Sequence, residues 1–236
     1  MTSPWLAFAL AAAAASATLL GWAIAASRRT WPPKVFGVVL LLAAAAMVLI
    51  SGLELLPTAM RAGQSIGITV LWVGVGAGIV VAMHLVADRL GLGGNKLGRS
   101  ALLVAVAIGL HNIPEGAAPV AAALLSWQAG VVTAVAVGLH NIPEGIAVAA
   151  PVMASGGTRA KAFRFTLIAT GGEILGAALA LLFAEALTPT NTSALLTLVA
   201  GIMISLSLVE LLPGGIALMR RTAEEEQARV NTGLGL

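Results

Sequence analysis

The sequence contains 236 residues, of which 59% are hydrophobic and only 10% charged. A soluble domain usually carries about 25% charged residues, so this composition excludes a water-soluble protein, soluble enzymes included. The formal net charge is +3. Because the basic residues flank apolar segments, we attribute this charge to membrane topology and expect no nucleic-acid partner. The chain has no cysteine, which excludes disulfides and thiolate metal sites.

Long apolar segments of about 20 residues are sufficient to cross a hydrocarbon core of about 30 Å as helices. The first segment has no basic region before it, so we expect a retained helix and not a cleaved signal peptide. We predict an all-α polytopic membrane protein, with one transmembrane domain over residues 1–219 and a short, polar, solvated cytoplasmic tail over residues 220–236. The seven predicted spans are Trp5–Ala26, Val35–Leu56, Ile66–Ala87, Leu102–Leu125, Ala129–Val152, Phe165–Leu187 and Ala194–Leu212.

Positive charge lies almost entirely on one side of these spans. All 13 Lys and Arg residues except Arg61 follow the first, third, fifth or seventh span. The positive-inside rule then places the N-terminus outside and the C-terminus in the cytoplasm. We therefore expect a multi-pass protein of the cell (inner) membrane.

Ionisable side chains also occur within or at the ends of the spans, where no Lys or Arg is available to pair with them. Such groups cost at least about 2.5 kcal/mol at the bilayer centre unless they meet a partner, water or a proton. A bound cation would serve several of them at once. They are Glu54, Glu115, Glu144, Glu173, Glu185 and Glu210, together with all three histidines, His84, His111 and His140.

Two nearly identical segments lie on consecutive spans. Ala105–Gly116 reads AVAIGLHNIPEG, and Ala134–Gly145 reads AVAVGLHNIPEG. Consecutive spans cross the membrane in opposite directions. Two such copies therefore indicate a site built around a pseudo-two-fold axis near the membrane midplane.

Helical spacing places the polar residues of each copy near one another. Glu115 lies one turn after His111 and points between His111 and Asn112, and a carboxylate can bind two ions through its two oxygens. The second copy repeats this arrangement with His140, Asn141 and Glu144. We therefore predict a two-metal site bridged by Glu115 and Glu144.

Each copy also contains a proline, Pro114 or Pro143. Proline removes an N–H and frees the carbonyl four residues earlier, and in lipid that carbonyl needs a donor, a water or an ion. We predict a functional kink in both helices. The alternative is a structural kink whose polar groups are satisfied within the protein.

The two HNIPEG motifs resemble the fourth and fifth helices of the ZIP divalent-metal transporters, particularly their broad-specificity bacterial branch. Further similarity lies in Gly52–Pro57 (GLELLP), Thr170–Glu173 (TGGE), Ala200–Met203 (AGIM) and Val209–Pro213 (VELLP). The resemblance implies a helical bundle with a midplane metal site and uptake of Zn²⁺, Fe²⁺ or related ions into the cytoplasm. It implies a first position formed by His111, Glu115, His140 and Glu144, and a second formed by Asn112, Glu115, Asn141, Glu144 and Glu173.

The chain departs from the family in two respects. Many relatives have a carboxylate where this chain has Asn141. Three carboxylates would then face two divalent cations, so we expect the second position to be weak, regulatory or only transiently filled. Relatives also usually have eight spans and a histidine-rich cytoplasmic loop, whereas we expect seven spans and no such loop from this sequence.

Imidazole and carboxylate ligands favour Zn²⁺ and also suit Fe²⁺, Mn²⁺, Co²⁺ and Cd²⁺. We predict a transporter and not an enzyme, with no resident cofactor. The lipid bilayer and divalent cations are its expected partners, and a homodimer is left open. An intramembrane metal-dependent hydrolase is the alternative, although neither motif copy reads H-E-x-x-H. His84, Glu54 and Glu210 are left open between ion-path and structural roles.

Overall fold

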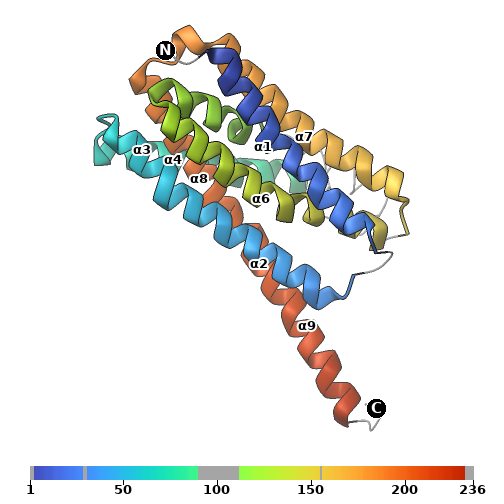
Figure 1. Cartoon of the computed structure of the whole chain (residues 1–236). Coiled ribbons are helices and arrows are strands. Elements are labelled where there is room, and N and C mark those ends of the chain that lie inside the picture. Colours follow the sequence, from blue (N-terminus) through green and yellow to red (C-terminus); the bar gives the residue numbers. More distant parts are fainter. Residues whose placement is uncertain (1–2, 29–30, 90–111, 155, 232–236) are drawn as a thin grey trace.

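The computed structural model describes residues 3–28, 31–89, 112–154 and 156–231 (Figure 1). Every secondary-structure element in these ranges is helical, which confirms the predicted all-α class. Residues 90–111 lie outside the described ranges, and with them His111 and the start of the fourth predicted span. The helices are α1 (Pro4–Ala26), α2 (Pro33–Ile50), η1 (Ser51–Leu55), α3 (Leu56–Arg61), α4 (Ile66–Arg89), residues 112–125, α6 (Trp127–Ala154), α7 (Arg159–Leu182), η2 (Ala184–Ala186), α8 (Pro189–Leu206), η3 (Ser207–Leu211) and α9 (Leu212–Asn231).

Six helical stretches of the described residues are long and apolar enough to cross a membrane. They correspond to six of the seven predicted spans, and helical residues 112–125 form the described part of the remaining one. Three of the helices begin with a proline as their first residue, namely Pro4, Pro33 and Pro189. The first N–H groups of a helix have no partner within it, so proline fits there without losing a hydrogen bond.

The bounds of α7 differ from the sequence prediction. The helix begins at Arg159 and not at Phe165, because the Thr158 hydroxyl accepts a hydrogen bond from the Lys161 N–H at 3.1 Å and caps the N-terminus. It ends at Leu182, several residues before the predicted end. Hydropathy marks where a helix becomes apolar, whereas a cap marks where the helix begins.

The C-terminal segment is helical in the described part of the chain. α9 continues without a break across the predicted boundary between residues 219 and 220, as far as Asn231. It extends beyond the other helices (Figure 1). The division into a transmembrane domain and a cytoplasmic tail stays a prediction, because one helix can carry a polar end out of a bundle.

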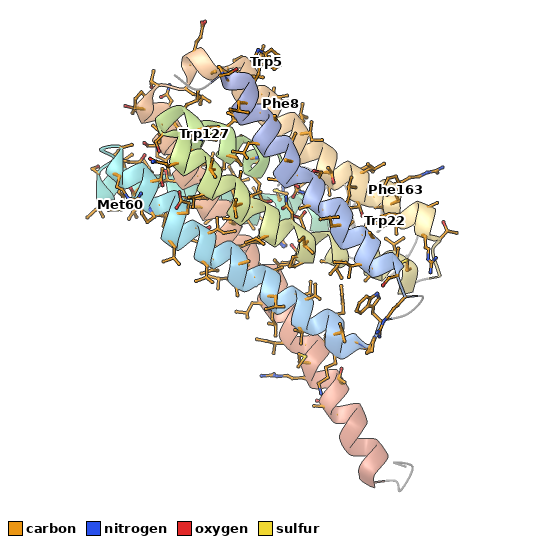
Figure 2. The ribbon with its side chains drawn as sticks, viewed as in Figure 1. Trp5, Phe8, Trp22, Met60, Trp127 and Phe163 are labelled. Atoms are coloured by element: carbon orange, nitrogen blue, oxygen red, sulfur yellow. The ribbon has the colours of Figure 1, made fainter. Side chains whose placement is uncertain are left out.

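The helices form two groups that meet along α2 and α6. In the first group α1, α6 and α7 pack against one another (Figure 1). α1 and α7 run antiparallel, because Trp22 near the end of α1 meets Phe163 near the start of α7, with ring centroids 4.7 Å apart (Figure 2). In the second group α4 packs along α8, and α2 packs along α9.

Two short π-helical segments interrupt the α-helical pattern. η1 joins α2 to α3, and η3 joins α8 to α9. Both lie in the same sequence pattern, M-x3-S-x2-E-L-L-P. The Ser51 hydroxyl donates to the Met47 carbonyl and the Ser207 hydroxyl to the Met203 carbonyl, each at 2.8 Å. The hydroxyl thus satisfies a carbonyl at each change of helix type.

The expected kinks at Pro114 and Pro143 are not accompanied by a break in the helix. The α-helix continues through both prolines, in residues 112–125 and in α6. The changes of helix type lie at η1 and η3, each of which ends two residues before a different proline, Pro57 or Pro213.

Candidate metal centre

Three buried side chains converge between residues 112–125 and α6. The Nε2 atom of His140 lies 3.3 Å from Glu115 Oε1 and 3.4 Å from Glu144 Oε2. One ligand atom from each residue lies within 4.8 Å of the other two. Exposure is 1% for His140, 1% for Glu115 and 9% for Glu144. His140 and Glu144 lie one turn apart on the same face of α6, and Glu115 reaches them from the neighbouring helix.

The two helices that supply these residues are antiparallel. The chain reverses between them at Ser126. Near this reversal a Cβ added to Gly130 would overlap Ala123, and further along His140 meets Glu115. The described residues of the first motif copy, Asn112–Gly116, therefore lie against the helix that carries the second copy.

His111 is the fourth member of the first predicted position, and it lies outside the described residues. The structure brings together the other three members, Glu115, His140 and Glu144. Their assignment as metal ligands is a proposal, which is developed below.

Two asparagine amides donate to buried carboxylates, one in this trio and one on the neighbouring helix α7. Asn112 Nδ2 donates to Glu144 Oε1 at 2.7 Å, and Asn141 Nδ2 donates to Glu173 Oε2 at 2.6 Å. Glu173 belongs to α7 and is 1% exposed. The residues predicted for the second position therefore lie together at the centre of the first helix group.

The cluster contains buried acceptors that lack donors. Among the described residues, the Oδ1 atoms of Asn112 and Asn141 have no hydrogen-bond partner, and neither has either oxygen of Glu115. The sequence from residue 100 to residue 158 contains no Lys or Arg. Buried acceptors need a donor or a cation, and this mixture of oxygen and imidazole ligands suits a divalent transition metal such as Zn²⁺.

Equivalent helix crossings hold the two motif copies. Gly116 of the first copy packs against the Glu173 backbone, and Gly145 of the second packs against the Thr18 backbone. A Cβ on either glycine would overlap the facing carbonyl, so a side chain at these positions would force the helices apart. α1 therefore lies against α6 as α7 lies against residues 112–125.

A cavity of about 140 Å³ connects the cluster to η3. Its lining includes His140 and Glu144 from the cluster, Met47 from α2, and Leu206 and Glu210 from the α8–η3 region. One cavity thus borders both the cluster and Glu210, an acidic side chain of the second helix group.

Glu210 lies 3.8 Å from the Nε2 atom of His84 on α4, and His84 Nδ1 lies 2.9 Å from the Val80 carbonyl. Glu210 therefore both borders the cavity and faces a histidine. Glu54 lies within η1, and one of its carboxylate oxygens accepts a hydrogen bond from Thr58 at 3.2 Å. The side chain of Asp88, one turn after His84, lies outside the description.

Thr18 of α1 is a neighbour of the cluster that the sequence prediction missed. Its hydroxyl donates to Glu173 Oε1 at 3.1 Å, and its side chain is fully buried. The available signal was a hydroxyl in an alanine-rich apolar helix. Ser16 gives the same signal, yet it is exposed and bonds to a carbonyl of its own helix, so sequence alone could not single out Thr18.

Known protein families provide an independent comparison. A profile described as ZIP zinc transporter matches residues 92–228, more than half of the chain and the region that contains the cluster. The chain belongs to the ZIP family. The resemblance inferred from the two HNIPEG motifs is thereby confirmed.

Curated relatives of this ZIP chain include two proteins named zinc transporter ZupT. The protein from Akkermansia muciniphila is 48% identical over 120 residues, which cover 50% of this chain and 44% of the relative. The protein from Escherichia coli O7:K1 is 43% identical over 116 residues, 49% of this chain and 45% of the relative. Protein zntB of Dictyostelium discoideum is 46% identical over 113 residues, 48% of this chain and 30% of the relative. The chain therefore spans less than half the length of these relatives.

Proposed function

We propose that this chain transports divalent metal cations across the membrane, with Zn²⁺ as the preferred substrate. The observation that carries the proposal is the convergence of Glu115, His140 and Glu144 inside an apolar helix bundle. Membership of the ZIP family and the names of the two ZupT relatives support it. The same ligand types suit Fe²⁺, Mn²⁺, Co²⁺ and Cd²⁺, which are the secondary candidate substrates.

Two neighbouring cation positions fit the residues of the cluster. In this proposal the carboxylates of Glu115 and Glu144 bridge the two ions. Glu115, Glu144 and Glu173 balance three of the four positive charges of two divalent cations, so the second position is the weaker. The first position consists of His111, Glu115, His140 and Glu144, and the second of Asn112, Glu115, Asn141, Glu144 and Glu173.

The direction of transport in this proposal is from the outside into the cytoplasm. The distribution of Lys and Arg supports a cytoplasmic location for the C-terminal end of α6. The cavity beside the cluster is also lined by Ala147 and Val148, which follow Glu144 toward that end of α6. It therefore supports a release route past Glu210 to the cytoplasm.

The lipid bilayer is the natural partner of six long apolar helices. Whether two copies of the chain form a homodimer is left open, and analytical ultracentrifugation in detergent distinguishes a monomer from a dimer. The hydrolase alternative gains no support from the site, because both carboxylates of the trio contact His140 and neither stands apart as a general base.

Uptake into proteoliposomes tests the proposed function. Liposomes loaded with a fluorescent Zn²⁺ indicator carry the wild-type chain, His140→Ala, Glu144→Gln or the control Glu185→Gln, whose side chain is exposed on η2. We expect the control to take up Zn²⁺ at the wild-type rate and both cluster variants to lose at least about tenfold. Wild-type uptake by both cluster variants would contradict the assigned site. Metal-dependent hydrolysis without ion flux would favour the enzyme.

A further inference from the structure

α1 and α7 occupy equivalent places around the two motif copies. Asn112 Nδ2 donates to the Ala169 carbonyl of α7 at 3.3 Å, and Asn141 Nδ2 donates to the Ala14 carbonyl of α1 at 3.0 Å. The two asparagines are equivalent in the repeat, and both acceptors are alanines. Ala169 lies four residues before Glu173, whose backbone faces Gly116 of the first copy. Ala14 lies four residues before Thr18, whose backbone faces Gly145 of the second copy.

A second pair of glycine crossings repeats the same relation. Gly176 of α7 packs against the Ile113 carbonyl, and Gly21 of α1 packs against the Ile142 carbonyl. Gly176 lies three residues after Glu173, and Gly21 lies three residues after Thr18. The two glycine crossings and the asparagine hydrogen bond of each motif copy therefore all give the same alignment of α1 with α7.

In that alignment Thr18 is the counterpart of Glu173. The two side chains meet, because Thr18 Oγ1 donates to Glu173 Oε1 at 3.1 Å. Asn141 Nδ2 donates to the other oxygen, Oε2, at 2.6 Å. The carboxylate is thus held through both oxygens by donors on two different helices. An ionised carboxylate can accept about four hydrogen bonds, so each oxygen keeps capacity for a cation.

The Thr18 hydroxyl has a competing acceptor within its own helix. The Ala15 carbonyl lies 2.8 Å from Oγ1, and a hydroxyl has one proton to donate. Thr166, which is equally buried, bonds to the Ala162 carbonyl of its own helix. Thr18 also reaches a side chain 155 residues away in sequence. Hydrogen bonds to an ionised carboxylate are the stronger kind.

We infer that Thr18 is a positioning residue for the second cation position, where its hydroxyl fixes the carboxylate of Glu173. The inference rests on the proposed function, because it concerns the binding of the transported cation. Thr18 itself binds no cation. Mutation of a residue that hydrogen-bonds to a metal ligand typically lowers the metal affinity by about 10- to 100-fold. Loss of this hydroxyl therefore weakens the second position about tenfold, while the first position, which does not use Glu173, keeps its affinity.

Calorimetric titration of the purified full chain with Zn²⁺ tests this inference. Thr18→Val removes the hydroxyl and keeps the shape of the side chain, and Thr18→Ala replaces it if the valine variant does not fold. Thr18→Ser restores the hydroxyl. Thr166→Val is the matched control, since it removes a buried hydroxyl that bonds only to its own helix among the described contacts.

We expect two Zn²⁺ equivalents on the wild type, with the weaker one about tenfold weaker again in Thr18→Val and unchanged in Thr18→Ser and Thr166→Val. Wild-type affinities in Thr18→Val, or equal weakening of both equivalents, would overturn the inference and leave the proposed function intact. Binding of only one Zn²⁺ equivalent by the wild type would likewise overturn the inference and leave the proposed function intact. A wild type that binds no Zn²⁺ would overturn the proposed function and this inference together.

Discussion

Replacement of Gly176 by alanine tests whether the helices around the cluster cross as closely as the structure shows. A Cβ at Gly176 would overlap the Ile113 carbonyl. Gly171 lies in the same helix with open space at the corresponding point, so Gly171→Ala is the matched control. Both substitutions gain a similar helix propensity of up to about 1 kcal/mol. The difference between them therefore measures the steric conflict.

The size of this difference follows from what the added methyl group meets. Overpacking of a well-packed interior costs about 1–3 kcal/mol, and a helical carbonyl cannot rotate away as a side chain can. For a chain of this size each kcal/mol lowers Tm by about 2–4 °C. We therefore expect the Tm of Gly176→Ala to lie about 2–12 °C below that of Gly171→Ala, and the Tm of Gly171→Ala to equal or exceed that of the wild type.

The assay is thermal unfolding of the purified variants in one detergent, followed by tryptophan fluorescence and by size-exclusion chromatography. Gly21→Ala changes the equivalent crossing against Ile142 and is expected to behave like Gly176→Ala. Equal Tm values for Gly176→Ala and Gly171→Ala would refute the close approach of α7 to residues 112–125.

Three further predictions concern cation binding. Zn²⁺ at a hundred times its Kd should stabilise the wild type and the control Glu185→Gln by about 2.7 kcal/mol. It should not stabilise Glu115→Gln, and a Zn²⁺-induced rise in the Tm of Glu115→Gln would argue against the cluster as the binding site. Binding requires neutral imidazole and ionised carboxylates, so Zn²⁺ affinity should fall as pH is lowered and protons should be released. Equal heats in buffers of different ionisation enthalpy would show that no protons are released. Asn141→Asp adds a negative charge beside the second position and removes the amide donor to Glu173, so Tm should fall without Zn²⁺ while the second equivalent binds more tightly. Unchanged affinity for that equivalent would count against the charge argument.

The central pair of helices could be predicted from the sequence because the motif occurs twice at helical spacing. Two copies on consecutive spans must run in opposite directions, and the one-turn spacing of His140 and Glu144 places both on one face of α6. The same spacing in the first copy places Glu115 on the corresponding face of its own helix, and a site shared by the two copies then requires these two faces to meet. The apolar lengths likewise identified the helices, although the start of α7 depended on the Thr158 cap, which hydropathy does not record.

The contribution of α1 to the cluster could not be predicted in this way. It depends on how α1 packs against α6 and α7, and the alanine-rich sequence of α1 hides its relation to α7. The matching residues are small, such as Ala14 with Ala169 and Gly21 with Gly176. They become informative only once their contacts with the two motif copies are known. Thr18 consequently carries no distinguishing mark in sequence.

The π-helical segment at Glu210 has a mechanical consequence for the helix that contains it. α8, η3 and α9 follow one another without a break, and the π turn accommodates one residue more than an α-helical turn would. Movement of this extra residue along the helix by one turn would rotate the residues that it passes by about 100° and shift them by about 1.5 Å. The flanking turns would keep their hydrogen bonds. A local change of winding at η3 would therefore turn the Glu210 carboxylate relative to the cavity that it lines, with no hinge and no break in the helix.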